Sequence, residues 1–407
     1  MKNILVLTSW SYKDALIQTY TLPYLKIILK KLPEGSRVFL LTQEQESLKM
    51  RPDELTAVKK QLMEDGIVLL PFKYIPFGPQ AGLAWTKSLL LLKKLVKAEG
   101  IDYLHAFCTP AGAIGYMLSL ITDKPLVLDS FEPHAEAMVE NKTWRPGSIS
   151  YKVLLLLEKL QYRRASYIVS ATEGMRKYAR EKYGVAEKKM WVKPACVDLE
   201  LFTSAKLKQQ RLLNELGLQD KLVCVYAGKF GGIYLDQEVF DFFKVAYDYW
   251  GDRFRVLLLT NQPRNDIDTW CKRAGVPAEI VLDLFVPHSK VADYMGLGDF
   301  ALTPVKPVPT KRYCTPIKNG EYWALGLPVV TTANISDDSG IIDQNSIGAV
   351  IETLNEEPYL AAVKKIDSLL SQPKEEVFTK IRNIAKRYRS FDIAEHVYQE
   401  IYGAKEK

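Results

Sequence analysis

Residues 313–332 contain charged groups at a spacing that suits the binding of a sugar phosphate. Thr315 is a good N-cap residue and Pro316 suits the first helical position, so we expect a helix to begin here. The free N–H groups of its first turn would stabilise a phosphate, and Lys318 would add a positive charge. Glu321 follows about one turn later, where its carboxylate could accept hydrogen bonds from two sugar hydroxyls. A surface helix with a solvated lysine and glutamate explains these residues equally well.

The residues after this helix predict where it ends. Gly326 can end the helix in a left-handed conformation, and Pro328 prevents the helix from resuming. The β-branched run at 328–332 is typical of a parallel strand that is covered on both faces. The segment therefore reads as loop, helix, turn and buried strand.

A second candidate site follows the apolar run at 222–227. Gly228, Gly231 and Gly232 would allow the backbone to approach a ligand closely, and Lys229 supplies a charge for a diphosphate. A glycine cluster after a strand is a weak signal by itself. Its spacing differs from G-x-G-x-x-G, which argues against a nicotinamide cofactor.

A third candidate site follows the apolar run at 126–128, where Glu132 and His134 lie in an expected loop. Histidine can donate or accept a proton near neutral pH, so His134 is a candidate for acid–base chemistry. A histidine that is only hydrogen-bonded within its loop fits as well. Thr172 opens a later expected helix and suits a capping role.

The order of the apolar runs predicts an α/β fold. In the first half, short buried runs alternate with segments of helical spacing, which indicates a doubly wound parallel sheet with helices on both faces. The expected strands there are 3–7, 38–41, 67–70, 103–107, 126–128 and 167–170. The expected helices are 20–32, 84–98, 111–120, 148–164 and 172–183. A second strand-and-helix series begins at residue 221, and we expect 334–342 and 348–351 to complete its sheet.

Length and charge narrow the class of protein. A chain of 407 residues should form two or three domains. Residues 1–200 carry 29 Lys and Arg against 21 Asp and Glu, whereas the remainder carries 26 against 27. The basic half indicates an anionic partner, such as a polyphosphate lipid, a membrane surface or an acidic glycan. No nucleic-acid motif occurs, so nucleic acid is not an expected partner.

The leucine-rich segment 86–97, with four lysines, fits an anionic membrane surface. A core-facing helix with solvated lysines is the other interpretation. Five scattered cysteines give no metal or disulfide pattern, and no apolar run is long enough to cross a membrane. We therefore expect a cytoplasmic protein, either free or in peripheral contact with the inner face of the membrane.

Three segments in the second half carry a family resemblance: 286–295, 299–304 and 313–332. The first segment has Val-Pro-His followed by an expected helix, and the second has Asp followed by an apolar strand that ends in Pro. The third has an expected helix that contains a glutamate, followed by Gly-x-Pro-Val-Val. This order resembles the nucleotide-sugar-binding half of glycosyltransferase family 4 enzymes, which have the GT-B fold. The family often has two glutamates with seven residues between them. Here the second matches Glu321, and Tyr313 stands at the first.

The resemblance implies a GT-B architecture of two Rossmann-like domains that face a central cleft. We place the acceptor domain at 1–197 and the nucleotide-sugar domain at 198–389, with a final helix at about 390–407 that packs back on the first domain. The implied reaction moves a hexose, with retention of configuration, from a UDP- or GDP-sugar to a glycan, lipid-linked or small-molecule acceptor. A role in polysaccharide biosynthesis would follow. The resemblance implies no required metal and no cofactor besides the nucleotide sugar as co-substrate.

The same resemblance assigns roles to residues. The implied catalytic residues are His134, Lys229 and Glu321. The implied donor-binding residues are Gly231, Gly232, Val286, His288, Tyr313, Thr315, Pro316, Lys318 and Glu321. Two alternatives stay open. A non-catalytic nucleotide-sugar-binding GT-B protein is one, because Tyr313 replaces a glutamate and the loop at 9–14 lacks glycine. A sugar-nucleotide epimerase is the other, because such enzymes share the GT-B architecture.

Overall fold

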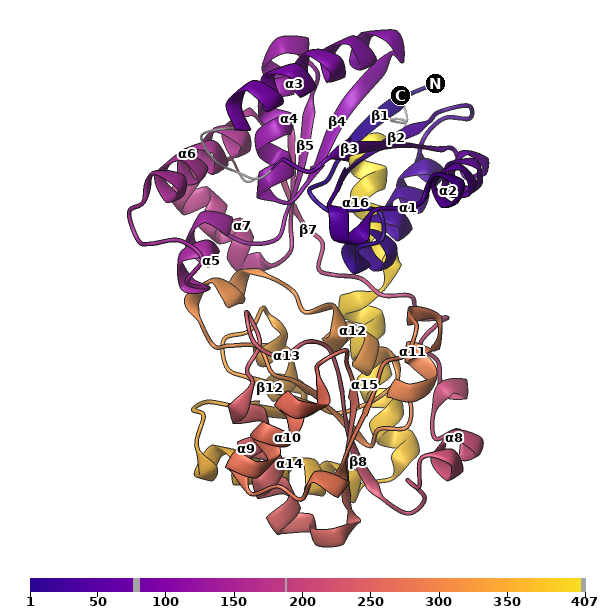
Figure 1. Cartoon of the computed structure of the whole chain (residues 1–407), viewed down its shortest axis with the longest axis vertical. Coiled ribbons are helices and arrows are strands. Elements are labelled where there is room, and N and C mark those ends of the chain that lie inside the picture. Colours follow the sequence, from indigo (N-terminus) through magenta and orange to yellow (C-terminus); the bar gives the residue numbers. More distant parts are fainter. Residues whose placement is uncertain (76–80, 187–188, 404–407) are drawn as a thin grey trace. The chain divides into compact units, whose positions relative to one another are not determined.

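The computed structural model describes residues 1–75, 81–186 and 189–403. The chain forms two compact units, one of Met1–Pro194 with Asp392–Lys407 and one of Ala195–Phe391. The boundaries predicted from the sequence lay between residues 197 and 198 and between residues 389 and 390. Each unit has a parallel sheet with helices on its faces (Figure 1). In the described ranges, no helix combines the length and the apolar character needed to cross a membrane.

The sheet of the N-terminal unit has seven strands within the described residues, in the order β3-β2-β1-β4-β5-β6-β7. Neighbouring strands pair in parallel, with Val6 opposite both Leu40 and His105 in the centre of the sheet. The bounds are β1 Asn3–Leu7, β2 Val38–Glu44, β3 Ile67–Lys73, β4 Ile101–Phe107, β5 Leu126–Ser130, β6 Tyr167–Ser170 and β7 Met190–Val192. The apolar runs predicted the first six of these strands. The short β7 was not predicted, because three residues give no periodic signal.

The helices of this unit cover both faces of the sheet. Their bounds are α1 Leu22–Lys31, α2 Pro52–Glu64, α3 Ala81–Ala98, α4 Thr109–Thr122, α5 His134–Glu140, α6 Ile149–Arg164, α7 Glu173–Tyr178 and α16 Phe391–Tyr402. Thr172 caps α7 as predicted, because its hydroxyl accepts a hydrogen bond from the N–H of Met175 at 2.9 Å. The segment expected as one helix at 172–183 is an α-helix followed by a wider turn at Ala179–Tyr183.

A buried polar cluster fixes α16 to this unit. The Tyr398 hydroxyl donates to Asp129 at 3.0 Å, and the Tyr402 hydroxyl lies 2.9 Å from Nδ1 of His105. Asp129 also pairs with the fully buried Lys193 at 3.3 Å. Burial and the Lys193 ammonium lower the pKa of His105 to about 3, so its imidazole is neutral at physiological pH. The last helix is therefore held by specific polar contacts as well as by apolar packing.

All residues of the C-terminal unit are described, and its sheet has the order β10-β9-β8-β11-β12-β13. The strand bounds are β8 Leu222–Ala227, β9 Phe254–Leu259, β10 Val281–Leu284, β11 Phe300–Thr303, β12 Val329–Thr332 and β13 Gly348–Ile351. The helix bounds are α8 Gln210–Glu215, α9 Gln237–Trp250, α10 Arg264–Ala274, α11 His288–Met295, α12 Ile317–Ala324, α13 Asp338–Asn345, α14 Glu356–Leu370 and α15 Lys374–Arg389. The expectation that 334–342 joins the sheet is wrong, because this segment is a turn that leads into α13.

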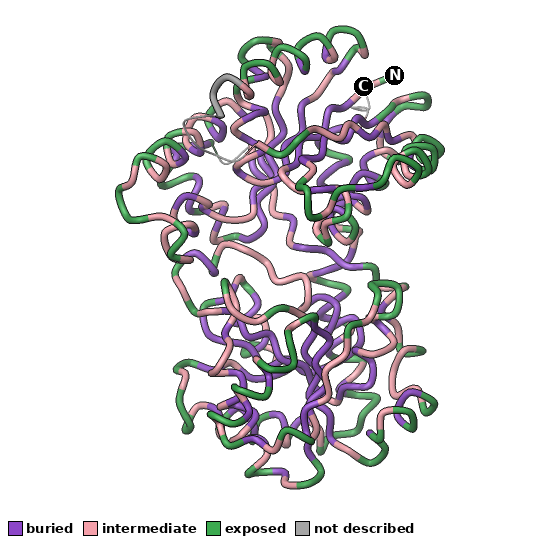
Figure 2. The backbone as a smooth tube through the Cα atoms, in the orientation of Figure 1, coloured by how far each residue is buried: buried purple, intermediate pink, exposed green. Residues whose placement is uncertain are grey.

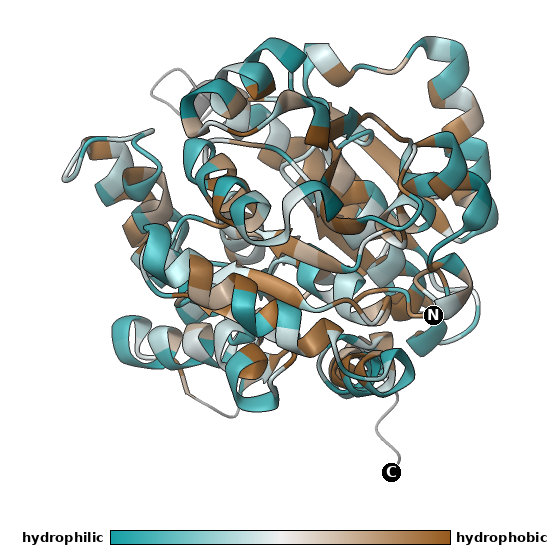
Figure 3. Cartoon of the chain, turned by 90° about the horizontal axis from the view of Figure 1, so that it is seen from below, coloured by the Kyte–Doolittle hydropathy of each residue, from teal (hydrophilic) through white to brown (hydrophobic). Residues whose placement is uncertain are grey.

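Burial follows the layers in both units. The inner strands are buried, the edge strands β3, β7 and β10 are only partly buried, and the outer turns of the helices are exposed (Figure 2). In Figure 3 the strands are predominantly hydrophobic, and hydrophilic residues lie along the helices. In the C-terminal unit, the aromatic residues of α9 and the apolar strands form one core cluster. A second cluster contains Tyr322, Trp323 and Leu325 at the end of α12.

Helix α12 ends as the sequence predicted. Gly326 has φ +68°, its N–H donates to the carbonyl of Trp323, and the N–H of Leu327 donates to the carbonyl of Tyr322. This pair of bonds satisfies carbonyls that the end of a helix leaves free. A Cβ atom at residue 326 would lie 2.2 Å from Cδ2 of Phe378 on α15. Glycine is therefore required here both by conformation and by space.

We expect Gly326→Ala to lower the free energy of unfolding by about 3 kcal/mol, from the left-handed backbone and the contact with Phe378 together. Gly217→Ala is the matched control, because Gly217 has φ +62° and nothing lies within 4 Å of its Cβ position. The control substitution should lower the free energy of unfolding by only about 1 kcal/mol. Urea unfolding measures both values, and equal losses would contradict the packing role of Gly326.

Candidate functional site

The candidate site of the C-terminal unit lies where the strand order reverses. Strands β8 and β11 are neighbours in the centre of the sheet, and the loops after them leave the same edge. Such a switch point is the usual ligand site of an open parallel sheet. Backbone bonds tie the two loops together, from Leu235 N–H to the carbonyl of Pro304 at 2.8 Å and from Lys306 N–H to that of Ile233 at 3.0 Å.

The loop after β8 contains the predicted glycines and lysine. Gly231 and Gly232 both have positive φ, at +73° and +62°. No atom lies within 4 Å of a Cβ position at Gly232, so the backbone there is open to a ligand. The Tyr226 hydroxyl donates to the carbonyl of Lys229, while the Lys229 side chain is exposed. Among the described residues, no carboxylate pairs with its ammonium group.

Helix α12 brings together Lys318 and Glu321, which form an ion pair of 2.8 Å. The Lys318 side chain is 33% exposed, whereas that of Glu321 is only 4% exposed. The lysine therefore faces solvent at the start of the helix, and the carboxylate lies below it in the protein. An anion at the first turn would share the Lys318 ammonium with Glu321, and the N–H groups of the first turn would add to its binding.

His288 is the first residue of α11 and lies within electrostatic reach of this pair. Desolvation lowers the pKa of His288, Lys318 acts in the same direction, and the carboxylate of Glu321 opposes both. The helix begins at His288 directly after Pro287, so Ser289 lies within its first turn. Val286 is half-buried and packs against the core cluster that contains the end of α12. The structure thus groups Val286, His288, Lys318 and Glu321 on one side of the unit.

The residues just before α12 are partly buried. Tyr313 ends a short 3₁₀ turn, Pro309–Tyr313, and Thr315 and Pro316 connect this turn to the helix. The predicted helix start is one residue too early, since Pro316 is the N-cap and Ile317 is the first helical residue. The ψ of Pro316 is 117°, which is extended rather than helical. Thr315 therefore does not hold the capping position.

The contacts that hold α12 were not predicted from the sequence. The Tyr322 hydroxyl accepts from the N–H of Ala227 at 2.9 Å, which ties the helix to the end of β8. Asn319 donates to Asp338 at 2.7 Å, and Asp338 is ion-paired with the buried Arg389. Asn319 and Glu321 inside a largely apolar segment were the available signal, because buried polar residues require partners. Their partners lie far away in the sequence and could not be identified from it.

The N-terminal unit carries His134, which is the first residue of α5 and not part of a loop as expected. Its Nδ1 lies 3.7 Å from a carboxylate oxygen of Glu132, so the two form an ion pair only when the imidazole is protonated. The imidazole is 30% exposed and therefore accessible to a small molecule. The structure places His134 in one unit and Lys229, Lys318 and Glu321 in the other.

A buried carboxylate supports the helix that begins at His134. Glu158 on α6 accepts from the N–H of Ala135 and from the Tyr183 hydroxyl, both at 3.1 Å. Burial raises the pKa of Glu158 to about 7, although these hydrogen bonds and His134 favour its ionised form. A further hydrogen bond, from the Tyr178 hydroxyl to Glu136 at 2.8 Å, joins α5 to α7. Glu158 thus positions the first turn of α5.

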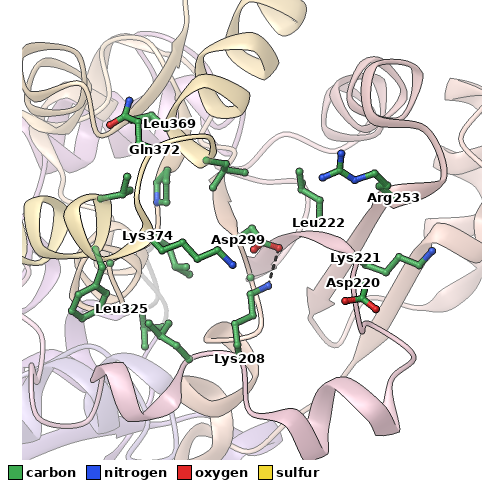
Figure 4. Close-up of a pocket in the computed structure, with 18 residues that line it drawn as sticks. Lys208, Asp220, Lys221, Leu222, Arg253, Asp299, Leu325, Leu369, Gln372 and Lys374 are labelled. Atoms are coloured by element: carbon green, nitrogen blue, oxygen red, sulfur yellow. Dashed lines mark hydrogen bonds and ion pairs between the residues drawn. The ribbon is translucent and has the colours of Figure 1, made fainter.

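A cavity of about 370 Å³ lies elsewhere in the C-terminal unit (Figure 4). Lys208 and Asp299 form an ion pair of 2.8 Å in its wall, and Lys374 extends toward them. Leu222 begins β8 and Pro328 precedes β12, so the cavity lies at the amino ends of the strands. It is therefore at the opposite edge of the sheet from Lys229 and contains none of the predicted site residues.

Comparisons with known proteins agree with this architecture. Residues 33–196 match the family model described as a glycosyl transferase 4-like domain. HepE from Anabaena, solved in complex with UDP, is 14% identical with a TM-score of 0.71, over 98% of this chain and 99% of HepE. Sucrose-phosphate synthase from Thermosynechococcus elongatus is 13% identical with a TM-score of 0.72, over 99% of this chain and 98% of the synthase.

WaaG, a glycosyltransferase involved in lipopolysaccharide biosynthesis, is 14% identical with a TM-score of 0.69, over 99% of this chain and all of WaaG. No curated protein sequence matches the chain. The resemblance inferred from the sequence is confirmed, because residues 33–196 match the glycosyl transferase 4-like family model and the two units have the α/β fold of these GT-B neighbours.

Glu158 predicts a pH dependence of stability. Its carboxyl ionises near pH 4.5 in the unfolded chain and at about 7 in the folded unit. Between these values the folded state binds the extra proton, so stability falls as pH rises from 4.5 toward 7 and is lowest above 7. The free energy of unfolding below pH 4.5 exceeds that above pH 7 by about 3 kcal/mol from this group. Glu158→Gln removes this loss, so the variant should gain stability over the wild type as pH rises from 5 to 8.

Chemical unfolding at several pH values checks this prediction. Glu34→Gln, which neutralises an exposed carboxylate of the same unit, is the control. Parallel profiles for the wild type and Glu158→Gln would show that Glu158 does not titrate in this range.

Proposed function

We propose that the protein is a glycosyltransferase that binds a nucleotide diphosphate sugar in its C-terminal unit. The observation that carries the proposal is the Lys318–Glu321 pair at the start of α12, at the same edge of the sheet as the open glycine loop with Lys229. The N–H groups of this helix and the two lysines supply positive charge for a diphosphate. The buried Glu321 carboxylate is suited to accept hydrogen bonds from two ribose hydroxyls.

The proposed reaction breaks the bond between the anomeric carbon and the diphosphate oxygen. A bond then forms from that carbon to an acceptor oxygen, with retention of configuration, and the acceptor proton leaves with the diphosphate or with water. Negative charge grows on the leaving oxygen, where Lys229, Lys318 and the first turn of α12 act. A well-aimed group of this kind lowers the activation free energy of the reaction by about 3 kcal/mol. The mechanism assigns no step to a metal ion.

HepE has been solved with UDP, with UDP-glucose, and with UDP and glucose. We therefore propose a UDP-sugar, and UDP-glucose in particular, as the first donor to test, with GDP-sugars as the alternative. Val286 and His288 would border the base, and Tyr313, Thr315 and Pro316 would line the diphosphate and sugar. Gly231 and Gly232 would allow the backbone to approach the diphosphate.

The N-terminal unit would bind the acceptor, which we propose to be a glycan or a lipid-linked sugar. His134 would either hydrogen-bond the transferred sugar or exchange a proton with the acceptor, because its imidazole is accessible and is placed by Glu158 through α5. Tyr313 favours one alternative, a protein that binds the donor without transferring its sugar. A phenol at this position cannot replace the charge of a glutamate next to the sugar.

Thermal unfolding with a panel of nucleotides and nucleotide sugars tests the donor. A ligand at about 100 times its dissociation constant should stabilise the fold by about 2.7 kcal/mol. We expect stabilisation by one nucleoside diphosphate and a larger effect with one of its sugars. No stabilisation by any of them would remove Lys229, Lys318 and Glu321 from the donor site. Binding without transfer to any acceptor would favour the non-catalytic alternative, and conversion of the donor without acceptor would favour an epimerase.

Three substitutions then test the assigned roles. Lys318→Ala and Glu321→Gln should each weaken donor binding at least about tenfold, because each removes a charged partner of the ligand. Lys229→Ala should lower turnover about a hundredfold or more. Lys364→Ala, an exposed lysine on α14, is the control. Calorimetric titration and initial rates measure these effects, and unchanged donor affinity in both α12 variants would contradict the assignment.

A further inference from the structure

Exposed apolar side chains gather on three helices of the N-terminal unit. Of the thirteen large hydrophobic residues that are exposed in the described chain, eight belong to α3, α4 and α6. They are Leu90, Leu91, Met117, Leu120, Ile121, Ile149, Val153 and Leu156. Helix α4 packs against both α3 and α6, so the three helices form one surface layer (Figure 1). Apolar groups in such numbers on one layer indicate an interaction surface.

The spacing of these residues places them on the outward stripe of each helix. Ile149, Val153 and Leu156 recur at intervals of four and three, and Ile149 is 82% exposed. Met117, Leu120 and Ile121 show the same periodicity on α4. Residues at these intervals share one face of a helix. Helices α4 and α6 therefore pack one side into the unit and present an apolar stripe to the outside, and α3 adds the exposed Leu90 and Leu91.

The exposed charged residues within these three helices are all basic, whereas Asp123, just after α4, forms an ion pair with Arg164. Helix α3 contains Lys87, Lys93, Lys94 and Lys97 and no acidic residue, and α4 contains no charged residue at all. On α6 the basic residues are Lys152, Lys159, Arg163 and Arg164. Its only acidic residue, Glu158, is 1% exposed. At helical spacing, Lys94 and Lys97 fall on the same face as Leu90, and Lys152 falls on the same face as Ile149 and Val153.

From these observations we propose that the α3–α4–α6 layer binds the surface of an anionic lipid bilayer. Apolar stripes can enter the boundary between headgroups and acyl chains, while lysines beside them contact anionic headgroups. The charge argues against a second copy of the same face, because two such layers would repel each other. The proposal concerns a surface of the N-terminal unit and is independent of donor binding in the C-terminal unit.

Sedimentation of the full chain with lipid vesicles tests the proposal. Vesicles of phosphatidylcholine and phosphatidylglycerol in equal parts should bind the protein, and added salt should weaken the binding. Vesicles of phosphatidylcholine alone should bind much less. Lys93→Glu with Lys94→Glu should weaken binding to the anionic vesicles at least about tenfold, and Ile149→Ser with Leu156→Ser should have an effect of similar size.

The control is Lys59→Glu with Lys60→Glu, which makes the same charge change on exposed residues of α2 in the same unit. This variant should bind anionic vesicles nearly as well as the wild type. Equal losses in the α2 and α3 variants would show that net charge, not this layer, decides binding, and would overturn the proposal. Absence of vesicle binding by the wild type would also overturn it. Either result leaves the donor-binding measurements unaffected, so failure of this proposal is distinguishable from failure of the proposed function.

Discussion

The C-terminal unit depends on how helix α12 is buried. Every residue from Asn319 to Ala333 is buried, yet the turn that begins two residues earlier must stay open to act on a ligand. This requirement brings an amide and a carboxylate into a closely packed region, where each costs free energy unless it is paired. The amide nitrogen of Asn319 donates to Asp338, which is itself ion-paired with Arg389, and Lys318 pairs with Glu321 at the boundary. These polar groups thus anchor the helix, because their partners are within hydrogen-bonding reach at only one position of the helix.

These anchors also relate the two halves of the candidate donor site. Tyr322 binds the backbone at the end of β8, one residue before the glycine loop, and Arg382 binds the carbonyl of Ala324, the last residue of α12. A shift of the helix along its axis would break both contacts. The first turn of α12 and the loop at 228–232 therefore keep a fixed relation without a ligand, which reduces the cost of ordering on binding.

The sequence predicted the fold better than the site. Apolar runs identify strands because a doubly wound sheet buries them on both faces, and this held from β1 to β6. The same reasoning failed at 334–342, where the apolar Ile341 and Ile342 belong to a helix, α13, rather than to a strand. The motifs that indicated a glycosyltransferase lie at 286–332, whereas the family model matches 33–196. The resemblance therefore rests on separate features in the two units.

Within the site, the sequence predicted the features that depend on residues close together in the chain, such as the turn at Gly326 and the approach of Lys318 to Glu321. Contacts between distant residues were beyond those rules. Asn319 and Asp338 are 19 positions apart, and Asp338 and Arg389 are 51 apart. Only the folded chain brings them together. The start of α12 was misplaced by one residue because Pro316 suits both the N-cap and the first turn, and only its backbone angles distinguish the two.

Helix α6 links the two proposals made for the N-terminal unit. Its inner side carries Glu158, which holds the first turn of α5 and so places His134. Its outer side carries Ile149, Val153 and Leu156 in the layer proposed to meet a bilayer. One rigid helix would then fix the distance between the lipid surface and the residue assigned to the acceptor. An acceptor sugar linked to a lipid would fit this arrangement, because its lipid would stay in the bilayer while the sugar reached α5.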